Sequence, residues 1–340
     1  MHPLIQPDST TIAQTTPTGN AIAQAVTQGY ALGEILDCVL MRRGFNHVYG
    51  LRFADGRRAV ARLSAERPRG GPNTHYEAAL LAHLKAAGAA VAATLPARDG
   101  GVAITMDLPE GDRTLMVFEH LDGDPPGESL PDIEATGRGL ALLHEAAKDY
   151  RGPTSRYVLE LPQLLGDSLQ RLCTAPTMDD ALRADFTAIA QRLEARIAAM
   201  PALTRVACHG DCHGSNNFMT DGPDGTRVAS FFDFDDCGPG WLAYELCVYL
   251  WAILPRTPGG ELDAASSERW HRYLSGYRGV RQIDSADFNA IAAFLPVRQF
   301  WLMGEYAGRI SVWGTQAIPT SWLRKQVALL TAWESLKTPD

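Results

Sequence analysis

The chain has 340 residues, of which 46% are hydrophobic and 21% are charged, as is ordinary for a soluble globular enzyme. This length allows one large core or two lobes, and the net charge of −8 argues against nucleic acid as a partner. The first residues show neither the basic start nor the apolar segment of a secretory leader, and the sequence contains no apolar run of about 18 residues. We therefore expect a cytoplasmic protein without a membrane partner, in which the 6 cysteines stay reduced.

The N-terminal part predicts a small antiparallel lobe at residues 20–120, after a flexible arm at 1–19 that is rich in Ser, Thr, Pro and Gln. The sequence Ala-Asp-Gly-Arg at 54–57 is typical of a hairpin turn between two strands. At 75–87, Ala and Leu recur at helical spacing. Strands are expected at 32–41, 47–53, 58–63, 102–106 and 114–118, and a further short helix at 20–28.

Residues 121–127 read Leu-Asp-Gly-Asp-Pro-Pro-Gly and are predicted to be the hinge between two lobes, because nearly all of them are turn formers. The remainder, 128–340, is expected to be a mainly helical lobe. Its one predicted strand pair, 205–208 with 228–232, brackets a polar motif. Helices are expected at 133–147, 161–173, 178–200, 242–254, 265–276, 287–309 and 321–336.

The polar motif is the most informative part of the sequence. It reads His-Gly-Asp-Cys-His-Gly-Ser-Asn at 209–216 and continues, after a hydrophobic strand, as Phe-Asp-Phe-Asp-Asp at 232–236. Phosphoryl transfer from Mg-ATP needs a carboxylate that orients the attacking hydroxyl and accepts its proton. It also needs an amide oxygen and a second carboxylate for the metal. A strand–loop–strand arrangement would place Asp211, Asn216 and Asp233 around one site.

The same residues allow other interpretations. Cys208, Cys212 and the two histidines of the motif are possible zinc ligands, but their spacing is not C-x2-C and no second Cys/His pair lies at zinc-ribbon distance. Haem attachment would need a different spacing and an export signal. A nucleophile pair of Cys212 and His213 is disfavoured because neighbours in sequence seldom point at each other.

Together the motifs at 209–216 and 232–236 resemble the aminoglycoside phosphotransferase and choline kinase-like group, and the likeness extends over roughly residues 30–335. This resemblance implies an α+β, bilobal, protein-kinase-like fold. Such a fold has a small antiparallel β-sheet N-lobe with one helix and a mainly helical C-lobe. ATP and Mg²⁺ would bind between the lobes.

The resemblance also assigns roles within the motif. Asp211 would be the catalytic base, and Asn216 and Asp233 would be Mg²⁺ ligands. Asp235 would be an additional ligand or a substrate contact. His209 would brace the catalytic loop through hydrogen bonds.

In the small lobe, the resemblance requires a cation on the third strand that holds the phosphates and an acid on the helix that positions it. Arg62 stands where the family often has Lys, and Glu77 is the matching acid. A short loop would present backbone N–H groups to phosphate, and the segment before the hinge would receive adenine. The nucleotide-binding candidates are Arg62, Glu77, Gly44, Asn46, Glu119 and His120.

The acceptor is expected to be a hydroxyl of a small molecule that is aminoglycoside-, amino alcohol- or homoserine-like. The short connection after Asp233 favours this over a Ser/Thr protein kinase resembling the bacterial stress-response kinases, and a non-catalytic binding protein is a third hypothesis. Arg298 could bind an anionic group, but a surface ion pair is the role that we predict for it. We expect a monomer or homodimer. The candidate substrate residues are His213, Asp236, Trp241 and Glu245.

Overall fold

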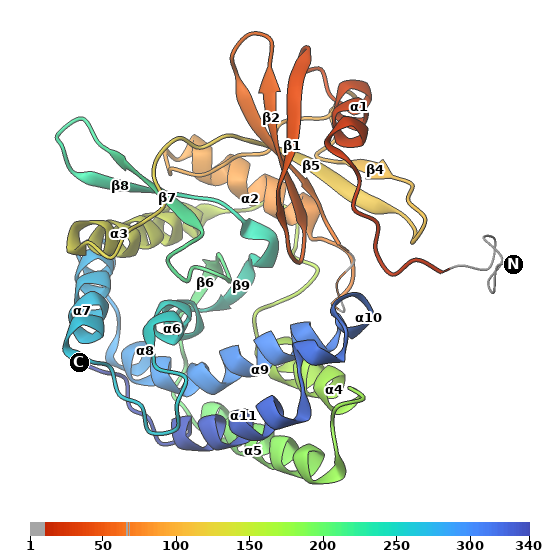
Figure 1. Ribbon diagram of the computed structural model, residues 1–340. Helices are drawn as coiled ribbons and strands as arrows, with labels where there is room; N and C mark the ends of the chain where they lie inside the picture. The colour runs from red at the N-terminus through yellow and green to blue at the C-terminus, as the bar shows by residue number, and fades with distance from the viewer. Residues whose placement is uncertain (1–10, 66, 68) are drawn as a thin grey trace, which may run out of the picture. The chain divides into compact units, whose positions relative to one another are not determined.

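The computed structural model describes residues 11–65, 67 and 69–340, which form two compact units (Figure 1). The first unit comprises the described residues up to Thr74, together with Ala93–His120 and Ser311–Gly314. The second unit comprises His75–Ala92, Leu121–Ile310 and Thr315–Asp340. The chain thus passes from one unit to the other at the start of the predicted hinge. Residues 1–10 of the predicted arm lie outside the described residues.

The first unit is built on a five-stranded antiparallel sheet with the strand order β1-β2-β3-β5-β4. Alternate residues of β2, among them Tyr49, Leu51 and Phe53, are buried in the core, as the period of a strand requires. Gly56 has a φ of 86° in the β2–β3 turn, which confirms the predicted hairpin. The strands are β1 (Ile35–Arg43), β2 (His47–Phe53), β3 (Arg58–Leu63), β4 (Ile104–Met106) and β5 (Arg113–Glu119).

Helix α1 (Gly19–Gly29) covers part of this sheet, and Ile22 and Val26 are buried in the same core. The segment before α1, which belongs to the predicted arm, is held in the first unit. Tyr49 Oη donates to the Pro17 carbonyl at 2.7 Å, and Arg113 Nη1 donates to the Thr15 carbonyl at 2.9 Å.

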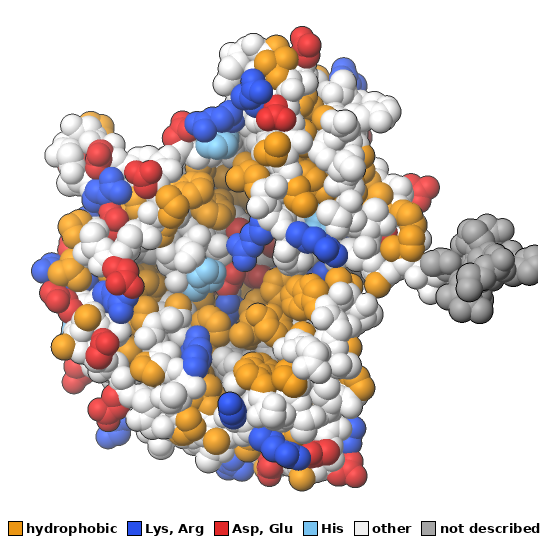
Figure 2. All heavy atoms as spheres, viewed as in Figure 1, with side chains coloured by type: hydrophobic (Ala, Val, Ile, Leu, Met, Phe, Trp, Pro, Cys, Tyr) orange, Lys and Arg blue, Asp and Glu red, His pale blue; other side chains and the backbone are white. Residues whose placement is uncertain are grey.

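The surface of the first unit carries exposed hydrophobic side chains as well as charges. Figure 2 shows charged and hydrophobic groups interspersed over the face in view. At the edge strand β1, four large hydrophobic side chains are exposed: Leu36, Val39, Leu40 and Met41. In the β1–β2 turn, the Phe45 ring lies 4.9 Å from the ring of Trp313, which belongs to the short segment Ser311–Gly314 of this unit.

The second unit is mainly helical, as predicted. Helix α2 (Thr74–Ala86) lies in this unit from His75 onward, although the sequence suggested the small lobe. Its His83 Nε2 is 2.8 Å from the Ala146 carbonyl oxygen, and Tyr76 packs edge-on against Tyr150. The other helices of this unit are α3 (Leu130–Ala146), α4 (Asp167–Cys173), α5 (Asp180–Ala198), α6 (Leu242–Ile253), α7 (Ala264–Arg278), α8 (Ser285–Ala290), α9 (Phe294–Ala307) and α11 (Thr320–Trp333). Helix α10 (Ile310–Trp313) belongs to the first unit from Ser311 onward.

One long predicted helix, 287–309, is divided in the structure. It consists of α8, a 3₁₀ turn at Ile291–Ala293 and α9. Pro296 lies in the first turn of α9, where a missing N–H costs nothing, whereas inside a continuous helix it would break the hydrogen bonding. The break therefore follows from the proline.

The prediction of a single strand pair in this unit is wrong, because there are two. β6 (Arg205–Cys208) pairs with β9 (Gly238–Trp241), and β7 (Asn217–Asp221) pairs with β8 (Arg227–Phe231). β9 reads Gly-Pro-Gly-Trp and lacks the β-branched residues that indicate a strand. The first half of the motif lies between β6 and β7, and the second half lies between β8 and β9.

Candidate active site

The catalytic loop, defined here as residues 209–216, connects β6 to β7. Gly210 has a φ of 86°, and a Cβ atom at this position would overlap the carbonyl oxygen of Asp236. Only glycine meets both conditions without strain. The close approach brings the loop directly against the second half of the motif, where Asp233 follows β8.

Glu245 on α6 holds the start of the loop. Its two carboxylate oxygens accept hydrogen bonds from the backbone N–H groups of His209 and Gly210, both at 3.0 Å. The side chain is fully buried, and burial raises its pKa, although His209 and the two amide donors oppose this shift. The expectation that Glu245 contacts substrate is therefore wrong, since both of its oxygens are used within the protein.

His209 joins the two halves of the motif. Its Nε2 lies 2.9 Å from the Phe232 carbonyl oxygen, and its Nδ1 accepts the backbone N–H of Asp211 at 3.3 Å. These partners are compatible only with a proton on Nε2. The arrangement agrees with the bracing role that the family resemblance implies.

The Asp211 carboxylate is held by two side chains and stays partly accessible. Its Oδ1 accepts a hydrogen bond from Arg298 Nη2, and its Oδ2 accepts one from Asn216 Nδ2 at 3.0 Å. His213 Nε2 lies 3.6 Å from the same Oδ2. The side chain of Asp211 is 21% exposed, so the carboxylate is both oriented and reachable.

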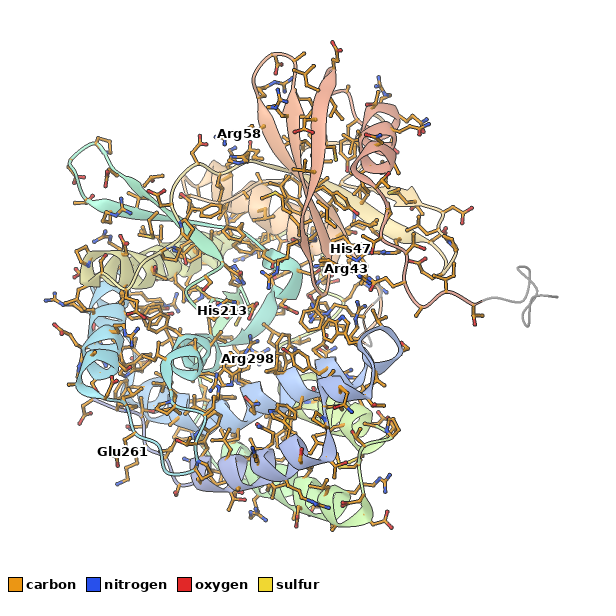
Figure 3. All side chains as sticks on the ribbon, in the orientation of Figure 1. Arg43, His47, Arg58, His213, Glu261 and Arg298 are labelled. Atoms are coloured by element: carbon orange, nitrogen blue, oxygen red, sulfur yellow. The ribbon has the colours of Figure 1, made fainter. Side chains whose placement is uncertain are left out.

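Contact between Arg298 and Asp211 was not predicted from the sequence. The Arg298 side chain is 2% exposed, so the predicted surface ion pair is wrong. The guanidinium donates from Nη1 to the Gly210 carbonyl at 3.1 Å and lies 4.0 Å from the ring centre of Trp301. Burial alone would lower its pKa, but Asp211 and other neighbours raise it on balance. Figure 3 shows Arg298 on α9 and His213 on the catalytic loop.

The residues proposed to hold a metal are oriented by local geometry. Asn216 Nδ2 donates to both the backbone oxygen of Asp211, at 2.9 Å, and its Oδ2. Because both partners only accept, the amide oxygen of Asn216 must face away from Asp211. Asp233 has φ 65° and ψ 55°, the one left-handed non-glycine residue in the described part of the chain, and such strain concentrates at functional sites. Asp235 is buried, and its carbonyl accepts from Tyr157 Oη.

This donor set suits Mg²⁺ better than a softer metal. Among the described residues, no three His, Cys, Asp or Glu side chains converge so that they could hold a metal by themselves. Mg²⁺ commonly takes one or two protein oxygens and completes its shell with water and substrate phosphates. Cys208 and Cys212 are buried, and burial raises the pKa of both thiols, so neither is available as the thiolate that zinc or nucleophilic chemistry needs.

In the first unit, the nucleotide-binding candidates are engaged locally. Arg62 is buried, with its guanidinium 4.9 Å from the ring centre of Phe118. Asn46 Oδ1 accepts the Ala65 N–H at 3.1 Å. The Gly44 N–H donates to the Asn46 carbonyl at 3.0 Å, so the expectation that it is free to bind phosphate is wrong.

The three remaining nucleotide-binding candidates are divided between the two units. The backbone N–H of Glu119 donates to the Ala93 carbonyl oxygen at 2.9 Å. His120 is the last residue of the segment Ala93–His120 of the first unit. Glu77 is buried on α2 of the second unit.

The comparison with known families decides what the chain is. Residues 41–283 match the phosphotransferase enzyme family, which is well over half of the sequence. The protein belongs to this family. The resemblance found in the sequence is confirmed, and so is the α+β, protein-kinase-like fold. It is a phosphotransferase.

Similar proteins support the same assignment. An uncharacterised protein of Deinococcus radiodurans is 33% identical over 92% of this chain and 89% of its own. Stress response kinase A of Escherichia coli K12 is 24% identical over 66% of each chain. The solved structure of an amicoumacin kinase in complex with AMP-PNP and Ca²⁺ superposes with a TM-score of 0.70, at 18% identity, over 91% of this chain and 92% of that one. This last likeness shows the fold alone.

The remaining substrate candidates of the phosphotransferase differ in position. His213 lies beside Asp211; burial lowers its pKa and the charge of Asp211 opposes the shift. Trp241 is half-buried and packs against Phe294, with ring centres 5.4 Å apart, which indicates a structural role. Asp236 is buried, and its backbone contacts the loop at Gly210.

Within the described residues, no helix is both long and apolar enough to cross a membrane.

Proposed function

We propose that this phosphotransferase uses Mg-ATP to phosphorylate a hydroxyl of a small molecule, with Asp211 as the catalytic base. One observation carries the proposal. The Asp211 carboxylate is oriented by hydrogen bonds to both oxygens, yet its side chain is 21% exposed, and it adjoins the outward amide oxygen of Asn216. A base must combine fixed orientation with access to the proton that it removes.

The chemistry assigned to the residues is simple. The acceptor hydroxyl would donate a hydrogen bond to Asp211 Oδ2, and this carboxylate would take the proton as the acceptor oxygen bonds to the γ-phosphorus of ATP. The bond from that phosphorus to the oxygen bridging to the β-phosphate would break, and ADP would leave with this oxygen. His209 keeps the two halves of the motif together through Phe232. Asn216 and Asp233 would hold Mg²⁺, which supplies neutralisation of the phosphate charge when it is bound. The role of Asp235 as a further ligand stays a prediction.

Nucleotide contacts are proposed for the first unit. Arg62 would bind phosphate, since guanidinium forms two parallel hydrogen bonds to phosphate oxygens. Asn46 would assist it, and the backbone around Glu119 and His120 would receive adenine. The Arg62 guanidinium now lies over the Phe118 ring. It would bind phosphate either from this position or after moving away from the ring. The role that the sequence suggested for Glu77 stays a prediction.

A small-molecule acceptor is favoured over a protein by the segment after Asp233. Only a 3₁₀ turn (Phe234–Asp236) and β9 precede α6, which leaves no room here for a long activation segment. Likeness to an amicoumacin kinase supports this choice. Aminoglycosides, amino alcohols and homoserine-like compounds are the acceptor classes to test first.

A Ser/Thr protein kinase is the second candidate, favoured by the similarity to stress response kinase A. A non-catalytic binding protein is the third. It receives least support because the base Asp211 and the oxygen donors Asn216 and Asp233 are all present.

The deciding experiment has two stages. The melting temperature is measured with Mg-ATP, with ATP in the absence of magnesium and with Mg-GTP, because a ligand that binds only the folded chain stabilises it by ~2.7 kcal/mol at a concentration of 100 Kd. ADP release is then measured with panels of hydroxylated small molecules and with a generic protein substrate. A magnesium-dependent shift with turnover of a small molecule supports the proposal. ADP release with the protein substrate alone supports the second candidate. Nucleotide binding without any turnover supports the third.

A further inference from the structure

We infer that Arg298 is a positioning residue for the catalytic base, and that its fork-shaped guanidinium fixes the orientation of Asp211 from α9. The inference rests on the proposed function, in which Asp211 receives the acceptor hydroxyl. It concerns a residue outside the two motifs, separated from Asp211 by 87 positions in the sequence.

The fork holds two consecutive residues of the catalytic loop. Nη2 donates to the side-chain Oδ1 of Asp211, while Nη1 donates to the carbonyl oxygen of Gly210 at 3.1 Å. One rigid, planar group therefore fixes both the path of the backbone and the rotation of the carboxylate. Arginine can do this because its N–H groups have a set geometry, which a lysine ammonium lacks. Oδ2 is left to face the acceptor, beside Asn216 Nδ2.

The guanidinium is itself held by aromatic rings. Its Cζ lies 4.0 Å from the ring centre of Trp301 and 5.2 Å from that of Trp251. Trp251 is oriented in turn, because its Nε1 donates to Gln299 Oε1 at 2.8 Å. Gln299 Nε2 then donates to Gln326 Oε1 on α11 at 2.9 Å. The position of the fork is thus determined by side chains from α6, α9 and α11.

The asymmetry of the pair argues for a role beyond stability. Arg298 is 2% exposed, but Asp211 is 21% exposed. A buried arginine is costly unless it is paired, and a fully buried acid would pair with it at least as well. On the same helix, Glu305 shows the opposite arrangement: its carboxylate is fully buried, and Oε1 lies 3.7 Å from Nη2 of Arg171 on α4, whose side chain is 16% exposed. Arg298 instead pairs with the one carboxylate that must stay accessible.

The test compares Arg298→Met and Arg298→Lys with Arg171→Met, a matched loss of a paired arginine on the Glu305 side of α9. ADP release from Mg-ATP is followed with water and with each acceptor that the screen identifies, and the dissociation constant of Mg-AMP-PNP is measured separately. We expect Arg298→Met to lower kcat about 100-fold, as misplacement of a base does, with unchanged nucleotide affinity and KM. Arg298→Lys should recover only part of the loss, and Arg171→Met should keep kcat.

Chemical rescue separates positioning from folding. Guanidinium at millimolar concentration should raise the rate of Arg298→Ala, whereas methylammonium, which lacks the fork, should not. If the Arg298 variants do not fold, Trp301→Leu keeps the pair but removes one aromatic face, and should lower kcat about 10-fold at constant KM. A folded Arg298→Met with wild-type kcat, or a loss confined to KM, would overturn the inference. Absence of turnover in the wild-type protein would overturn the proposed function instead.

Discussion

The catalytic loop of the second unit and the β1–β2 turn of the first unit hold their polar groups in opposite ways. In the catalytic loop, backbone N–H groups are bound by Glu245 and the carboxylate of Asp211 is bound by Arg298, both from distant helices. In the β1–β2 turn, the Gly44 N–H is bound by the carbonyl of Asn46, its near neighbour.

This difference indicates two modes of preparation for catalysis. In the proposed function, distant partners hold the Asp211 carboxylate in its orientation before any substrate binds. Electrostatic preorganisation requires such an arrangement. In the proposed function, the Phe118 ring that Arg62 now contacts would be exchanged for phosphate when nucleotide binds. We therefore expect substitutions in the catalytic loop to act on kcat, and substitutions in the first unit to act on KM for ATP.

The largest effect is expected for Asp211→Asn, which keeps the shape of the side chain but removes the base. kcat should fall by about 10²- to 10⁴-fold, the usual contribution of general base catalysis, while the affinity for Mg-ATP stays close to that of the wild type. Steady-state kinetics with the identified acceptor and calorimetric titration with Mg-AMP-PNP measure the two quantities. Near-normal turnover would refute the assignment of Asp211.

A second, smaller effect is expected from the path of the loop. Gly210→Ala and Gly56→Ala both place a Cβ atom at a φ of 86°, but only the first would meet another atom, the Asp236 carbonyl oxygen. Gly56→Ala should cost about 1–2 kcal/mol of unfolding free energy from backbone strain alone. Gly210→Ala should cost clearly more and should also lower kcat. Urea denaturation of both variants provides the comparison, and equal losses would contradict it.

In the first unit, Arg62→Ala should raise KM for ATP by about 10-fold with little change in kcat, as the loss of one charged phosphate contact does. Arg58→Ala, an exposed arginine on the same strand (Figure 3), is the matched control and should leave KM unchanged. Arg62→Lys should fall between the two. An unchanged KM in Arg62→Ala would mean that Arg62 only packs on Phe118.

The last prediction concerns pH and a pair of distant partners in the interior of the second unit. His144 on α3 lies with Nδ1 2.7 Å from Tyr277 Oη on α7, and burial, reinforced by the charges of Arg281 and His209, lowers its pKa to about 3. Below its ordinary pKa of 6.5, the unfolded chain binds a proton that the folded chain refuses until about pH 3.

The contribution of His144 to the free energy of unfolding should therefore be fully present above pH 6.5. As the pH decreases from 6.5 to about 3, this contribution should fall by up to about 1.4 kcal/mol per pH unit. His144→Gln should have a lower stability at pH 7 but a flatter decline toward acid. Urea unfolding at a series of pH values measures both slopes. Parallel slopes in the two proteins would show that His144 is not the proton-linked group.

Much of the fold follows from local sequence patterns. The β2–β3 hairpin was predicted with its strand bounds because turn chemistry at Asp55 and Gly56 acts between neighbours. Asn216 reaches Asp211 across a separation of five residues, so the short loop alone brings them within hydrogen-bond distance. The predicted helix 287–309 is divided just before Pro296, in the first turn of α9.

The sequence by itself thus determined the bounds of β2 and β3, the mainly helical character of the second unit, and the family to which the chain belongs. Only the tertiary structure decided that Glu245 is bound to the loop 36 residues before it, and that Arg298 reaches Asp211 across 87 residues. The residues next to Glu245 and Arg298 in the sequence form no motif that would indicate these roles. The partner of a buried charge is chosen by how helices pack, and packing depends on contacts that lie far apart in the sequence.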